Sequence, residues 1–170
     1  MNPPPINWQT PHGKIGDAML NIVLVNPEIP PNTGNIGRIC VATRGTLHLI
    51  KPLGFKIDDR SLKRAGLDYW QHLDLKLWPD LQTYLGEVAH DKIVLTSSKR
   101  GTAYHEVKYA TDDHILFGPE TTGLSPELFR RFPSRVARIP MDHGKVRSLN
   151  LAVSVGIIVF EALKQTGNLL

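Results

Sequence analysis

Short apolar runs recur along this 170-residue chain, and segments of helical composition separate them. The first run, LNIVLV at Leu20–Val25, is continuous, which is typical of a strand buried on both faces of a parallel sheet. Five further runs are expected to be strands: Thr46–Ile50, Leu73–Trp78, Lys92–Ser97, His114–Gly118 and Arg135–Pro140. This alternation predicts an α/β fold with a mostly parallel six-stranded sheet flanked by helices.

Local signals mark where the intervening helices begin and end. The segment NIGRICVATR predicts a helix that the following glycine ends, and Asp58 or Asp59 is expected to cap a short helix. Ser125 followed by Pro126 marks the start of another helix, with serine as the cap and proline in the first position. The final helix is expected at about Ser148–Gln165.

Composition bounds the domain organisation and the compartment. Residues 1–18 are proline-rich and lack periodicity, so we expect a disordered extension there and one domain at 19–170. The longest apolar stretch is too short for a membrane span, and the N-terminus lacks the apolar core of a signal peptide. Cys40 is the only cysteine and is expected to pack in the core. An intrachain disulfide is therefore excluded, which fits a cytoplasmic protein.

Four polar, glycine-containing loops follow expected strands: NPEIPPNTG, TSSKRG, GPETTG and MDHGKVRS. Ligands of parallel α/β sheets bind at the carboxyl ends of strands, where all four loops fall. The alternative is that each loop is an ordinary turn. This alternative is less favoured for all four loops together than for any single loop.

The loop FGPETTGLS has the glycine spacing of a phosphate-binding loop, with Leu124 in place of the lysine. Pro119 removes a backbone donor from the turn, and Glu120 adds a charge that repels phosphate. These changes disfavour ATP and suit a neutral or cationic ligand. The first expected strand is likewise followed by prolines rather than by a dinucleotide fingerprint.

Charged and titratable residues give weaker signals. The formal charge of +4 is compatible with nucleic acid, and Lys145 and Arg147 precede the final helix, where an anion is favoured. Arg38 follows the first loop and His143 lies in the last one, although each could equally be a surface group. The seven histidines show no metal-binding spacing, so no metal site is expected.

The final helix is apolar nearly all round in its first three turns, LNLAVSVGIIVF. A surface helix should instead show one apolar stripe. The sequence favours a helix buried against a second subunit, with a central core helix in a monomer as the alternative.

Three segments together resemble the SPOUT-class ribose 2′-O-methyltransferases: NPEIPPNTGNIGRICVAT, ILFGPETTGLS and RIPMDHGKVRSLNLAVSVGIIVFEAL. The resemblance spans nearly all of Leu20–Lys164, and RAGLDYW and LHLIKPLGF add to it. Within that class the chain most resembles the small bacterial enzymes that methylate the wobble cytidine or uridine, nucleotide 34, of tRNA. The resemblance implies S-adenosylmethionine as methyl donor, tRNA as substrate through its anticodon loop, a homodimer, and a C-terminal trefoil knot around the cofactor pocket.

The resemblance also implies roles for individual residues. Arg38 matches the catalytic arginine, and further catalytic polar positions are Asn32, Glu120, Ser148 and Asn150. The positions that match cofactor contacts are Leu95, Gly118, Ile139 and Ser148. The RNA-binding candidates are Arg38, His143, Lys145 and Arg147.

Three positions depart from the family pattern, where Thr122 replaces an arginine, Val153 an asparagine and Phe160 a tyrosine. Because of these departures, an alternative function is that of a ribose methylase that acts at another position of tRNA or rRNA. A non-catalytic RNA-binding module is an alternative from a different class, which the joint presence of the five catalytic candidates disfavours. A protein that binds a small nucleotide is a more distant alternative.

Overall fold

The computed structural model describes residues 20–57 and 69–168, and these form a seven-stranded sheet in the order β3-β2-β1-β6-β4-β7-β5. The strands are β1 (Asn21–Val25), β2 (Thr46–Ile50), β3 (Leu75–Trp78), β4 (Ile93–Thr96), β5 (Thr102–Ala103), β6 (His114–Phe117) and β7 (Val136–Arg138). Every neighbouring pair is parallel. The α/β prediction is confirmed, with one strand more than the six expected, because the two-residue β5 is too short to show an apolar run.

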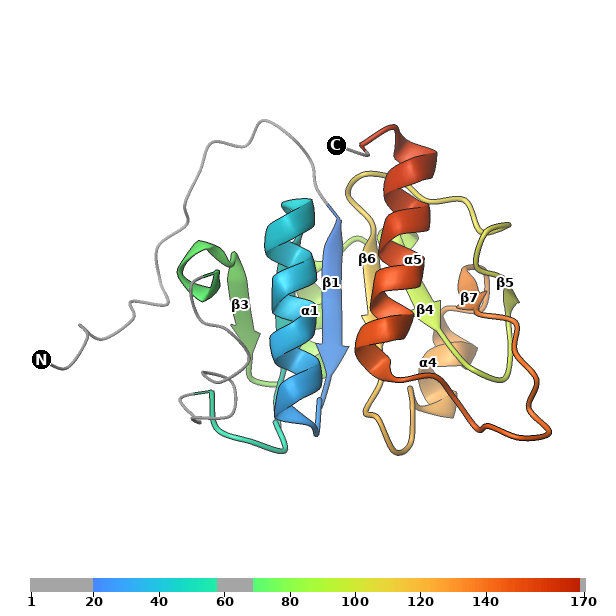
Figure 1. The fold of residues 1–170 in the computed structure, drawn as a ribbon, viewed down its shortest axis with the longest axis horizontal. Coiled ribbons are helices and arrows are strands. Elements are labelled where there is room, and N and C mark those ends of the chain that lie inside the picture. Colours follow the sequence, from blue (N-terminus) through green and yellow to red (C-terminus); the bar gives the residue numbers. More distant parts are fainter. Residues whose placement is uncertain (1–19, 58–68, 169–170) are drawn as a thin grey trace, which may run out of the picture.

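Helices cover both faces of this sheet. They are α1 (Pro30–Thr43), α3 (Leu81–Glu87), α4 (Pro126–Arg131) and α5 (Leu151–Thr166), with 3₁₀ turns η1 (Trp70–His72) and η2 (His90–Lys92). Figure 1 shows α1 and α5 side by side in front of the sheet and α4 behind it. The expected extension at 1–18 and the expected helix from Asp58 or Asp59 lie outside the described residues.

Two hydrophobic cores, one on each face of the sheet, follow from the alternation of side chains along each strand. On β1, Ile22 and Leu24 belong to the core beneath α1 and α5, while Val23 and Val25 belong to the core with α3 and α4. Cys40 is fully buried in the first core, where burial raises the pKa of its thiol. The expected packing role of this cysteine is therefore confirmed.

Helix α1 begins earlier than its sequence predicts, with prolines in its first two positions. Proline has no amide hydrogen to donate, so it is tolerated where a helix leaves its first donors unpaired. The left-handed residue that ends α1 is Arg44, with φ of 57°, rather than the glycine that follows it. Gly45 is closely packed, because a Cβ there would lie 2.8 Å from Cδ1 of Ile22 and 3.2 Å from the carbonyl oxygen of Leu20.

Helices α4 and α5 each follow a residue whose side chain caps the helix. Ser125 caps α4 with Pro126 next to it, as the sequence predicts. Helix α5 begins at Leu151 rather than at Ser148, because the side chain of Asn150 accepts hydrogen bonds from the amides of Ala152 (2.8 Å) and Val153 (3.3 Å).

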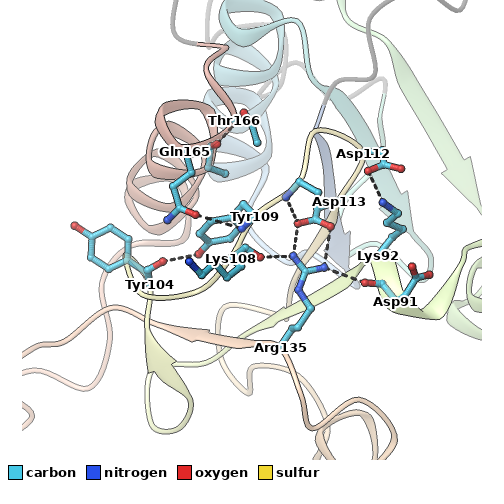
Figure 2. Close-up of polar contacts among 12 residues, drawn as sticks. Asp91, Lys92, Tyr104, Lys108, Tyr109, Asp112, Asp113, Arg135, Gln165 and Thr166 are labelled. Carbon is cyan, nitrogen blue, oxygen red and sulfur yellow. Dashed lines mark hydrogen bonds and ion pairs between the residues drawn. The ribbon is translucent and has the colours of Figure 1, made fainter.

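A buried ion pair joins the amino ends of three strands, as Figure 2 shows. Asp113 is fully buried directly before β6, and Arg135 precedes β7 and binds both oxygens of its carboxylate. The same guanidinium also donates to the backbone carbonyls of Asp91 and Lys108. The chain near this cluster is tied to the end of α5, where Oε1 of Gln165 accepts the amide of Tyr109 at 3.3 Å. This cluster lies at the amino edge of the sheet, opposite the carboxyl edge where the four polar loops begin.

A second polar cluster is buried between the sheet and α3. His48 is 2% exposed, and its Nδ1 accepts a hydrogen bond from Nε1–H of Trp78 (3.0 Å). That contact leaves Nε2–H to donate to Oδ1 of Asn21 at 3.0 Å, so the ring is neutral. Burial lowers the pKa of His48 to about 3 and that of His114 to about 4.

These lowered pKa values predict that stability falls in mild acid. In the unfolded chain a histidine binds a proton near pH 6.5, whereas the buried rings stay neutral, so the unfolded state binds more protons as the pH drops below 6.5. His48 alone should lower the free energy of unfolding by about 2 kcal/mol between pH 6.5 and pH 5. Urea unfolding at several pH values measures this. The His48→Gln variant should show a flatter profile and the exposed-site control His72→Gln an unchanged one, while a flat profile for the unsubstituted protein would contradict the expectation.

Candidate active site

Three residues predicted for the site form one chain of hydrogen bonds at the carboxyl edge of the sheet. Nδ2 of Asn150 donates to Oδ1 of Asn32 (2.9 Å), and Nδ2 of Asn32 donates to Oε1 of Glu120 (3.1 Å). Asn32 is 6% exposed at the start of α1, Asn150 caps α5, and Glu120 lies in the loop after β6. The parallel strands deliver these distant segments to one place.

Glu120 acts as a cap for α1 from outside the helix. The N-cap residue of α1, Ile29, has no capping side chain of its own. Instead, the Glu120 carboxylate accepts the backbone amides of Glu28 (2.8 Å) and Ile29 (3.1 Å) together with the Asn32 side chain. A carboxylate is favoured at this position because the start of a helix carries partial positive charge. Glu120 therefore fixes how α1 enters the site.

A second carboxylate makes the reciprocal contact. Glu28 accepts both the amide (3.0 Å) and the hydroxyl (2.8 Å) of Thr121, so the loops after β1 and β6 each hold the other. The sequence interpretation missed Glu28. The available signal was its place between two prolines in NPEIP, directly before a helix that has no capping side chain.

The glycines of the GPETTG loop close that loop on itself. A Cβ on Gly118 would lie 2.2 Å from the backbone of Gly123 and Leu124, and Gly123 has φ of +70°. Gly118 is thus required by the loop's own backbone, which is a different reason from the ligand approach suggested by a phosphate-binding loop. The loop is a compact turn that presents Glu120 and Thr121 to α1.

Arg38 lies on α1 but outside this hydrogen-bond chain. Six positions separate it from Asn32, which places it about 9 Å further along the helix and on its exposed side. Its guanidinium stacks over the ring of Tyr69, 4.7 Å from the centroid, and the Tyr69 hydroxyl donates to the carbonyl of Gly34 at 2.5 Å. Tyr69 is a second residue that the sequence interpretation missed as a site residue, although it lies within the segment RAGLDYW.

The predicted cofactor positions lie at the carboxyl ends of adjacent strands. Leu95 on β4 pairs with Leu116 on β6 and with Val136 on β7, and Gly118 and Ile139 directly follow those last two strands. Leu95 is fully buried, and Gly118 and Ile139 are half-buried. These positions are therefore neighbours across three strands.

The segment 139–149 follows β7 and carries Ser148 together with the three candidate RNA-binding residues His143, Lys145 and Arg147, all of which are exposed. Within the described residues, Gly144 is the one member of this segment whose amide donates a hydrogen bond, to Oδ1 of Asp142 at 2.9 Å. The other backbone N–H groups of this segment have no protein acceptor among the described residues, so they are available to solvent. An exposed segment beside half-buried strand ends fits a ligand that is held largely through backbone groups.

No cluster of metal-ligating side chains that could hold an ion occurs within residues 20–57 and 69–168. In the same part of the chain, every helix is too short or too polar to span a bilayer.

Comparison with known proteins gives one family match. Residues 19–160 match the model of the SpoU rRNA Methylase family. The chain is 47% identical over 150 residues to the tRNA (cytidine(34)-2′-O)-methyltransferase of Aeromonas hydrophila, covering 88% of this chain and 96% of that protein.

Solved structures show the same relationship. One, described as giving insight into 2-OH methylation of C/U34 on tRNA, has a TM-score of 0.80 and 43% identity, and the match covers 88% of this chain and 97% of that one. An AdoMet-bound rRNA methyltransferase from Sinorhizobium meliloti has a TM-score of 0.77 and 25% identity, and the match covers 88% of this chain and 57% of the other.

Proposed function

Because this chain belongs to the SpoU rRNA Methylase family, we propose that it transfers a methyl group from S-adenosylmethionine to the ribose 2′-oxygen of nucleotide 34, a cytidine or uridine, in tRNA. The observation that carries this proposal is the nearly end-to-end likeness to a tRNA (cytidine(34)-2′-O)-methyltransferase. A tRNA substrate implies that the enzyme works in the cytoplasm. Residues 19–170 form the methyltransferase domain in this proposal.

The backbone of Leu95, Gly118 and Ile139 and the side chain of Ser148 hold the methyl donor. The grouping of Leu95, Gly118 and Ile139 at the ends of β4, β6 and β7 supports their part of this assignment. When bound, S-adenosylmethionine supplies an electrophilic methyl group on a sulfonium centre and leaves as S-adenosylhomocysteine. No metal takes part in this proposal.

Arg38 is the residue that acts on the reacting oxygen. A ribose hydroxyl is a weak nucleophile at neutral pH, so attack requires alignment and stabilisation of the negative charge that develops on the oxygen. The Arg38 guanidinium, steadied by the Tyr69 ring, provides that charge and can also hold the adjacent phosphate.

Asn32, Glu120 and Asn150 support catalysis by fixing the helices. Their hydrogen bonds join the starts of α1 and α5 to the loop after β6. The position of Arg38 therefore depends on a partly buried polar chain that begins nearly two helical turns away. Ser148 lies in the same exposed segment 139–149 as His143, Lys145 and Arg147, which bind the anticodon loop together with Arg38.

Methyl transfer to unmodified RNA tests this function. Purified protein and labelled S-adenosylmethionine are incubated with tRNA that lacks its own modifications, and separately with unmodified rRNA. Label in tRNA alone supports the proposal. Label in rRNA favours the alternative target, and RNA binding without transfer to either RNA favours a non-catalytic RNA-binding module.

A homodimer through α5 completes the proposed enzyme, and the C-terminal trefoil knot of the family belongs to the same proposal. On α5, Val153 is 51% exposed and Phe160 is 50% exposed, and Ile157 lies between them on the same side of the helix. An apolar stripe of this kind on a surface helix supports burial against a second copy. A dimer of this kind explains why α5, which is apolar nearly all round, is partly exposed to solvent in the single chain.

The double variant Val153→Asp/Phe160→Asp should therefore be monomeric. Two carboxylates buried without partners cost several kcal/mol, which exceeds what a modest interface can offset. Light scattering after size exclusion measures the mass, with Gln82→Asp on the exposed side of α3 as the matched control. A dimeric double variant, or a monomeric unsubstituted protein, would refute the role of this stripe.

A further inference from the structure

Cations gather on a surface that the proposed chemistry does not use. The outer basic surface is formed by the segment that joins β4 to β5, by α4 and by the end of β7, and it comprises Lys99, Arg100, Arg130 and Arg138. Arg131 of α4 lies instead over the ring of Phe132. Glu127 is the only carboxylate in the sequence segments 96–103 and 126–138, and Arg135 in the second segment is neutralised by Asp113. These four cations against one carboxylate leave an excess of +3, while the formal net charge of the whole chain is +4.

The segment 97–101 is held firmly across β7. Strands β4 and β5 lie on either side of β7, so this short connection crosses that strand. The Ser97 hydroxyl accepts the amides of Lys99 (3.1 Å) and Arg100 (3.3 Å), and the Ser97 amide donates to the Ala137 carbonyl at 3.0 Å. Gly101 has φ of 108° and approaches the Val136 carbonyl so closely that a Cβ would lie 2.4 Å from it.

Two of the guanidiniums are positioned by contacts that leave other donors available. Arg100 lies over the ring of Phe129, 5.0 Å from the centroid, and Nε of Arg138 donates to the Gly101 carbonyl at 3.4 Å. An arginine stacked on a ring keeps its N–H edge for an anion and loses little conformational entropy when the anion binds. Beside Arg100, Phe129 and Pro133 line a groove of about 270 Å³.

This surface adjoins the proposed reaction site. Lys99 follows shortly after Leu95, and Arg138 immediately precedes Ile139. Figure 1 shows β5 at the edge of the sheet away from α1, with the segment that leaves β7 passing between this edge and the start of α5. A polyanion that reaches the carboxyl ends of β4 and β7 would therefore continue onto the outer basic surface.

We propose that the outer basic surface binds the phosphate backbone of the RNA substrate outside the methylated nucleotide. This inference rests on the proposed function, which makes RNA the polyanion. The surface recognises the phosphate backbone and not the base sequence, because its hydrogen-bond donors are lysine and arginine side chains on an open face. It adds affinity for the body of the RNA, while the choice of nucleotide remains with the reaction site.

The test is the double variant Lys99→Gln/Arg100→Gln, compared with the charge-matched control Arg44→Gln/Lys76→Gln on other elements of the fold. Fluorescence anisotropy with unmodified tRNA measures Kd over a range of salt concentrations. Loss of two phosphate contacts should raise Kd roughly 10-fold or more and reduce the slope of log K against log salt by about 1.5. The kcat at saturating tRNA, the Kd for S-adenosylmethionine and the methylated position should stay unchanged.

The inference would be overturned if the double variant and its control both bound tRNA with the Kd and the salt slope of the unsubstituted protein. A second variant, Arg130→Gln, tests the same surface from α4 should the first variant lose its thermal unfolding transition. The binding measurement does not depend on turnover. Absence of methyl transfer by the unsubstituted protein would therefore refute the proposed function alone, while a selective loss of RNA affinity in either variant would still support the outer basic surface.

Discussion

The Arg38→Ala variant should lose methyl transfer to tRNA by roughly 10²- to 10³-fold in kcat while its Kd for S-adenosylmethionine stays unchanged. Removing the guanidinium takes away the positive charge that stabilises the ribose oxygen in the transition state. It leaves the ends of β4, β6 and β7 intact, because the described contacts of Arg38 lie over Tyr69 and not at those strands. Single-turnover kinetics and calorimetric titration of S-adenosylmethionine measure the two quantities separately.

The Arg44→Asn variant is the matched control. It also removes an arginine charge from α1, and asparagine tolerates the left-handed conformation found at Arg44. This control should retain full activity. Equal losses of turnover and cofactor affinity in Arg38→Ala would mean that Arg38 maintains the pocket and does not act on the reacting oxygen.

The Arg135→Met variant should lose about 3–5 kcal/mol of unfolding free energy. Methionine fills similar volume but leaves the fully buried carboxylate of Asp113 without its main partner. The backbone carbonyls of Asp91 and Lys108 lose their donor at the same time. Since Arg135 joins the amino ends of three strands, the loss should appear as a cooperative shift in urea denaturation.

A neighbouring ion pair supplies the control. Lys92 pairs with Asp112 at 2.8 Å, but both side chains are partly exposed, so Lys92→Met should cost less than about 1 kcal/mol. The two variants thus differ mainly in burial of the carboxylate that is left behind. Similar losses in both would contradict the claim that the Asp113–Arg135 pair secures the amino edge.

The elements that the sequence predicts correctly are those with a local physical signal. The continuous apolar run of β1 reflects burial on both faces, and Ser125–Pro126 carries both the cap and the first turn of α4. Arg38 and the other candidate site residues came from motif resemblance, and their catalytic roles remain predictions. The hydrogen-bond chain through Asn32, Glu120 and Asn150 confirms only that these three meet.

The features that the sequence did not reveal depend on contacts between distant segments. Helix α1 takes its cap from Glu120 in another loop, so its start could not be located from its own residues. Strand β5 exists because a short connection crosses β7, which no hydropathy pattern encodes. Glu28 joins the site through Glu120 and Thr121, both of which are far away in the sequence.

The central claim is that this chain methylates the ribose of nucleotide 34 in tRNA. Unmodified tRNA is incubated with the protein and S-adenosylmethionine, then digested by nuclease and mapped by mass spectrometry of the fragments. The account predicts a single added methyl group on the ribose of cytidine or uridine 34, present with the unsubstituted protein and absent with Arg38→Ala. A methyl group on a base, or on a ribose elsewhere in the tRNA with nucleotide 34 unmodified, would contradict it.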